Sequence, residues 1–248
     1  MSLSTEQCLA AIAEHSAGFA AATRDHLTER VQHCPDWDVA DLVAHLTDVQ
    51  WFWATIAEQL PEEPPQEGRP GRAPDEQLVE TFERGAERLV SVLGAADQDA
   101  ACWTWASQRD VAFVTRHQVQ EAAVHHWDAA NVAGATWTID PLVAADCVEE
   151  FLTFSVSSDA DPASEPRPAL DGSFAVVATD AGASWTVSDG KNPDTGTLAV
   201  STGAADGLPA VEATGGDLLL WLYARKDIDT SPVPAVLVER FRGLLYTD

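Results

Sequence analysis

The period of the hydrophobic pattern changes near residue 158, and this change constrains the fold more than any other feature of the sequence. Up to Phe151, apolar residues recur three and four positions apart, which is typical of amphipathic helices. After the polar, proline-containing segment SDADPASEPRP, they occur in short alternating runs, which are typical of strands. We therefore expect a helical domain over residues 1–157 and a small α+β domain over residues 170–248.

Five helices are expected before the change of period, over about 5–28, 38–59, 78–93, 111–132 and 140–151. Ser4 to Gln7 fits a capping box, Asp38 is a favourable N-cap, and Asp140 with Pro141 supplies an N-cap and an N1 proline. The segment at 61–74 holds five prolines and two glycines, so we expect a loop there.

The C-terminal part contains short β-like runs and two helical ones. We expect strands over 174–179, 184–188, 197–202 and 209–213, followed by helices over 217–224 and 235–245. This mixture indicates a small α+β domain.

The charge excludes some partners. Forty acidic and fourteen basic residues give a net charge of −26, which repels nucleic-acid phosphates and anionic membranes. No run approaches the roughly 20 apolar residues of a membrane span, and the N-terminus MSLSTEQCLA lacks the features of a secretory signal. We expect a cytoplasmic protein; the sequence does not indicate its oligomeric state.

The four cysteines form no C-x-x-C pair, so the sequence suggests neither a disulfide framework nor a thiolate zinc site. We expect mostly buried thiols.

Three polar residues fall on helix faces that point inward. His45 follows Leu42 by three positions on an apolar stripe, and Glu121 and His125 are four residues apart on one face of another helix. Polar groups against a core need compensation, and a divalent metal ion held by two histidines and a glutamate provides it, with one position left open. The alternative is a hydrogen-bonded core histidine at 45 and a surface pair at 121 and 125.

Two stretches carry a family resemblance: CPDWDVADLVAHL (34–46) and RHQVQEAAVHHWDAA (116–130). They resemble the mycothiol-dependent maleylpyruvate isomerase family of DinB-like metalloenzymes. The resemblance implies a DinB-like four-helix bundle and identifies His45, Glu121 and His125 as the metal ligands. Asp128 matches a flanking charge, with two open interpretations: it orients a ligand, or it is a helix-end charge that pairs with arginine.

The C-terminal stretches FAVVATDAGASWTVSDG (174–190) and GGDLLLWLYAR (215–225) more loosely resemble the family's sterol-carrier-like domain. In the family an arginine after this helix reaches towards the active site, which matches Arg225. The other interpretation of Arg225 is a cation that stabilises a helix C-terminus.

The resemblance implies an enzyme that uses a low-molecular-weight thiol, mycothiol, to modify or isomerise a small electrophile. The implied cofactor is a divalent metal ion, zinc first, with nickel or iron as alternatives. Asp128 and Arg225 would be its catalytic residues. Two other functions stay open: a thiol-independent metal hydrolase, and a non-catalytic metal-stabilised binding module.

Overall fold

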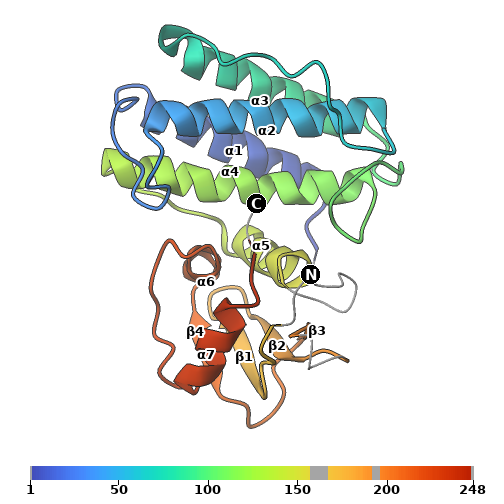
Figure 1. Cartoon of the computed structure of the whole chain (residues 1–248), viewed down its shortest axis with the longest axis vertical. Helices are drawn as coiled ribbons and strands as arrows, with labels where there is room; N and C mark the ends of the chain where they lie inside the picture. The colour runs from blue at the N-terminus through green and yellow to red at the C-terminus, as the bar shows by residue number, and fades with distance from the viewer. Residues whose placement is uncertain (1, 157–166, 192–195, 247–248) are drawn as a thin grey trace. The chain divides into compact units, whose positions relative to one another are not determined.

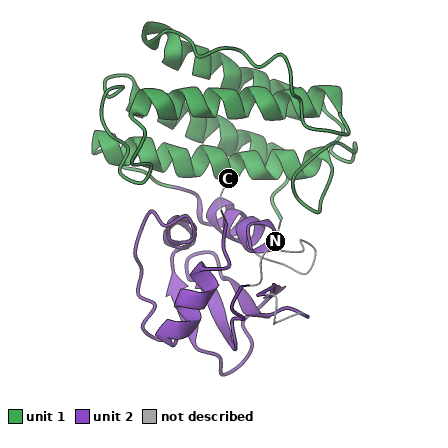
Figure 2. Cartoon of the chain, viewed as in Figure 1, with its two compact units in different colours: residues 1–138 green, residues 139–248 purple. Residues whose placement is uncertain are grey.

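The computed structural model describes residues 2–156, 167–191 and 196–246. Two compact units divide the chain, residues 1–138 and residues 139–248 (Figure 2).

The first unit is a four-helix bundle (Figure 1). Its helices are α1 (Thr5–Thr23), α2 (Val39–Gln59), α3 (Leu78–Ala95) and α4 (Val111–Ala133). A short 3₁₀ turn, η1 (Asp75–Gln77), leads into α3. Helix α1 packs on α4 and α3, and α2 packs on α3 and α4, so each helix buries its apolar face against two others.

Local signals set the helix starts. Ser4 caps α1 and Asp38 caps α2, each with a reciprocal capping box, while Asp110 caps α4 by accepting from Phe113 N–H. One predicted helix end was inaccurate: α1 ends at Thr23 rather than near residue 28. The 3₁₀ turn η1 was not predicted.

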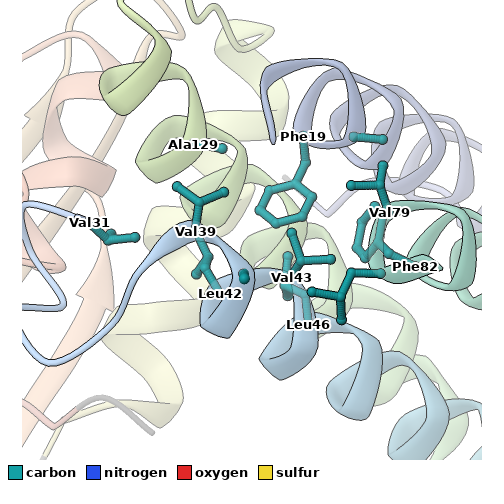
Figure 3. Close-up of a cluster of buried hydrophobic side chains, with 12 residues drawn as sticks. Phe19, Val31, Val39, Leu42, Val43, Leu46, Val79, Phe82 and Ala129 are labelled. Atoms are coloured by element: carbon teal, nitrogen blue, oxygen red, sulfur yellow. The ribbon is translucent and has the colours of Figure 1, made fainter. Parts of the chain in front are cut away.

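Buried side chains from all four helices form a cluster at the end of the bundle where α2 and α3 begin and α1 and α4 end (Figure 3). Phe19 of α1 lies 4.7 Å from Phe82 of α3, measured between ring centroids, and Leu42 and Leu46 of α2 pack into the same cluster. Burying side chains of this size contributes roughly 1.5–3 kcal/mol each. This cluster fixes the inward face of α2.

The second unit contains a four-stranded sheet, with strands β1 (Ser173–Ala178), β2 (Ala183–Asp189), β3 (Leu198–Thr202) and β4 (Ala210–Ala213). Their order is β3-β2-β1-β4, antiparallel except for the parallel pair β1–β4. Val176 lies opposite both Trp185 and Val211, which fixes the register. Helices α5 (Pro141–Phe154), α6 (Gly215–Leu222) and α7 (Ala235–Arg242) complete the unit.

The predicted domain boundary differs from the division seen in the structure. We placed the fifth helix in the first domain, whereas α5 belongs to the second unit because it packs against α6. Phe151 lies 5.1 Å from Tyr223 between ring centroids, and a Cβ on Gly215 would lie 3.0 Å from Ala144 Cβ, so the two helices meet closely. The predicted linker lies partly outside the described residues.

The other elements agree with the sequence interpretation to within a few residues. The segment 61–74 contains no helix or strand, as its prolines predict. Within the described residues, no helix is both long and apolar enough to cross a membrane.

Candidate metal centre

Helices α2 and α4 together position the three predicted ligand side chains. His45 lies on α2 and is half-buried, whereas Glu121 and His125 lie one turn apart on α4 and are 7% and 9% exposed. The capping box at Asp38 and the buried neighbours Leu42 and Leu46 hold the face of α2 that carries His45 against α4. A histidine and a carboxylate from distant parts of the sequence therefore meet inside the bundle.

The three side chains converge. Each offers a ligand atom, and these atoms all lie within 4.8 Å of one another. The rings of His45 and His125 are 5.3 Å apart between centroids, and His125 Nε2 lies 3.8 Å from Glu121 Oε2. Four-coordinate zinc with bonds of about 2.0–2.1 Å holds its ligand atoms roughly 3.4 Å apart, so small side-chain rotations bring this set into range. The nitrogen and oxygen donors suit a divalent transition metal.

Asp128 distinguishes the two nitrogens of His125. Its Oδ2 lies 2.9 Å from His125 Nδ1, and the carboxylate is fully buried. A hydrogen on Nδ1 that is donated to this carboxylate leaves the lone pair of Nε2 facing Glu121, which is the arrangement that metal-binding histidines usually have. Of the two interpretations of Asp128, this geometry favours the orienting role.

The tryptophan that precedes α2 contacts the site. The ring of Trp37 lies 4.8 Å from that of His45, between centroids. His117, one turn before Glu121, points elsewhere: it is 1% exposed and packs among the rings of Trp53, Trp105 and Phe113. Its surroundings are those of a core histidine.

A second histidine contact was missed at the sequence level. His15 of α1 and His126 of α4 approach each other to 3.1 Å between their Nδ1 atoms. Burial lowers the pKa of His15 to about 4, and burial together with the neighbouring His15 lowers that of His126 to about 4. No local sequence pattern pairs these two rings. A Cβ on Gly18 would lie 2.3 Å from the His126 ring, which shows how closely α1 approaches it. Both rings are therefore neutral near pH 7.

Arg225 belongs to the second unit, where it follows α6. Its guanidinium donates to the backbone carbonyl of Tyr223 at 3.0 Å and lies 5.9 Å from the Tyr223 ring centroid. The role expected for Arg225 remains a prediction.

A surface groove of about 650 Å³ lies between α1 and α3, lined by small side chains such as Ala13 and Ala17 and by glutamates such as Glu87. None of the three converging ligands lines it. The groove is separate from the candidate metal centre, because the chemistry lies between α2 and α4.

Residues 8–130 match the family model of the mycothiol maleylpyruvate isomerase N-terminal domain, a range that contains the three predicted ligands and Asp128. A comparison with curated proteins finds no match.

Two solved structures share the fold along most of the chain. A crystal structure of the mycothiol-dependent maleylpyruvate isomerase has a TM-score of 0.60 and 13% identity, and covers 90% of both chains. That of a histidine-to-alanine mutant of the mycothiol-dependent maleylpyruvate isomerase has a TM-score of 0.58 and 12% identity, and covers 88% of both. Through its N-terminal domain, the chain belongs to the mycothiol maleylpyruvate isomerase family.

Proposed function

We propose that this protein is an enzyme that uses mycothiol, or a similar low-molecular-weight thiol, to modify or isomerise a small electrophilic substrate at a divalent metal ion. The metal ligands are His45, Glu121 and His125, and zinc is the first choice of metal. One observation carries the proposal: three donor atoms from two helices lie within 4.8 Å of one another inside the core.

Each protein residue has a separate task. Asp128 holds the His125 ring and its tautomer, so that Nε2 points at the site. A metal ion with an open position lowers the pKa of a thiol or water bound to it and polarises a carbonyl oxygen. We assign to Arg225 the binding of a substrate carboxylate or oxyanion, for which its planar guanidinium is suited.

The cysteines of the chain support a nucleophile recruited from solution. Three of the four, Cys8, Cys102 and Cys147, are buried. Burial, with a smaller contribution from Asp110, raises the pKa of the Cys102 thiol to about 11, so this thiol is not ionised at neutral pH.

Cobalt substitution provides the test. Adding mycothiol to the cobalt-loaded protein should produce a thiolate-to-cobalt charge-transfer band in the near ultraviolet. The Glu121→Ala variant should lose both the metal and the band. If no cellular thiol produces the band while metal is bound, the thiol mechanism is wrong, and hydrolysis or a binding module becomes the better explanation.

The Arg225→Ala variant separates substrate binding from thiol binding. It should keep the charge-transfer band, because the arginine is assigned to the electrophile. Turnover should fall by a factor that corresponds to roughly 2–4 kcal/mol, typical of a charged contact to a transition state. Lys226→Ala is the control, since Lys226 pairs with Asp217 on the surface at 2.7 Å.

A further inference from the structure

A small cavity lies inside the four-helix bundle; Glu121 lines it, whereas His45 and His125 do not. Its volume is about 10 Å³, and all four helices line it. Apolar side chains such as Ile12, Phe82 and Leu89 form most of the wall. A buried water needs about this much space, together with two to four polar partners.

The polar partners come from two glutamines. Gln50 of α2 and Gln118 of α4 both line the cavity and are 4% and 2% exposed. Among the described residues, Gln50 Oε1 and Gln118 Nε2 accept from or donate to no protein group. A buried amide atom without a hydrogen bond keeps its desolvation penalty, so a ligand that satisfies both atoms is favoured.

A helix glycine makes room for one of these amides. Gly85 lies in the interior of α3, where glycine is less favourable than alanine. A Cβ at this position would lie 2.5 Å from Gln50 Oε1. Any larger residue would therefore displace the Gln50 amide from its present place.

We propose that one water molecule binds in this cavity and positions the metal-binding carboxylate. The water accepts a hydrogen bond from Gln118 Nε2, donates one hydrogen to Gln50 Oε1 and donates the other to the carboxylate of Glu121, which lines the same cavity. Gln50 and Gln118 are thus positioning residues that act on Glu121 through the water. This inference rests on the proposed metal centre.

The water is tested first, in metal-free protein. In a nitrogen-15-labelled sample, the side-chain NH₂ of Gln118 should show a cross-peak to water in a rotating-frame Overhauser experiment. The exposed side chain of Gln66 provides a reference for rapidly exchanging water. No cross-peak at Gln118 would overturn the proposal, whatever the metal does.

The second test measures zinc affinity. A chelator competes for zinc with the wild type and with the variants Gln50→Leu and Gln118→Leu. Loss of a group that orients a ligand should weaken binding about 10–100-fold. Gly85→Ala should weaken it in the same direction, because the added Cβ displaces the Gln50 amide. Thr55→Val is the control, since it removes a buried hydroxyl from α2 outside the cavity.

The thermal stability of the metal-free variants distinguishes positioning from packing. Replacing a buried amide by leucine should leave the melting temperature unchanged or raise it, while zinc affinity falls. If wild-type protein binds zinc and both leucine variants bind it equally tightly, the positioning role is wrong and the metal centre stands. If the wild-type protein binds no zinc, the proposed function fails, and the positioning role fails with it.

Discussion

Helix α4 carries two consecutive histidines that face different helices and have different surroundings. His125 faces α2, where its Nδ1 meets the carboxylate of Asp128 at 2.9 Å and its Nε2 lies 3.8 Å from Glu121. His126 faces α1, where its Nδ1 lies 3.1 Å from that of His15. Successive helix residues are about 100° apart, so the two rings cannot share a face.

The difference shows which buried histidines suit a metal. Carboxylates beside His125 add negative charge and fix its tautomer, and both effects favour a bound cation. At the His15–His126 contact the carboxylate that acts on His126 belongs to the exposed Glu14, and burial lowers both pKa values to about 4. We therefore expect the first region to bind metal and the second only to pack.

The largest expected effect is loss of the metal from His125→Ala. Wild-type protein should contain about one divalent ion per chain, and the variant almost none, because two remaining ligands hold a divalent ion poorly. His126→Gln is the matched control and should keep its metal. Elemental analysis after metal-replete expression checks both, and full metal content in His125→Ala would contradict the site.

The second effect is on the pH dependence of stability. Burial lowers the pKa of His15 from 6.5 to about 4 in the folded state. A lowered histidine pKa stabilises the fold above the unfolded value, and this stability is lost as the pH falls from about 6.5 towards 4. The loss reaches at most about 3 kcal/mol for this residue.

Urea unfolding of metal-free protein at several pH values measures this loss. His15→Leu should flatten the dependence between pH 6.5 and 4, because the variant has one fewer buried histidine to protonate. An unchanged dependence would show that His15 is not kept neutral by the fold.

The third effect is a weaker metal affinity in Asp128→Ala. Removing the carboxylate that orients His125 should raise the zinc dissociation constant about 10–100-fold, or roughly 1.4–2.7 kcal/mol. Asp48→Ala changes the net charge equally but removes only an exposed pair with Arg69, so its affinity should stay near wild type. If the wild type, Asp128→Ala and Asp48→Ala bind zinc equally tightly, Asp128 has only a structural role.

The smallest expected effect is on the packing around His126. Gly18→Ala would place a Cβ 2.3 Å from His126, so we expect a destabilisation of about 1–2 kcal/mol, where an unobstructed helix position would gain stability. Gly71→Ala, with no atom within 4 Å of the added Cβ, is the control. Chemical denaturation compares them, and stabilisation by Gly18→Ala would contradict the described contact.

Several features could be predicted from local sequence because local physics causes them. The predicted capping box at Ser4 and the predicted N-caps at Asp38 and Asp140 depend on residues within one helical turn. Helical spacing also places Glu121 and His125 on one face before any partner is known. The same spacing places His45 on an inward face of another helix, and the family resemblance identifies it as a ligand.

Other features depend on which elements meet, and the sequence alone did not reveal them. The change of period predicted a boundary after α5, but the packing of Phe151 and Tyr223 assigns α5 to the second unit. An apolar stripe on a helix predicts that this face is buried, but it does not predict which other helix or strand covers the face. The contact between His15 and His126 and the amide environment of Gln50 were hidden for the same reason.

The sequence by itself determined the helix and strand periods, their caps and the ligand types, because these depend on neighbours within a few residues. Only the tertiary structure decided which of two adjacent histidines faces carboxylates and which faces another histidine. That outcome depends on the angle of about 100° between adjacent residues around the axis of α4, and on which helix packs against each face. Long-range packing fixes both, and a single sequence does not encode it in any local pattern.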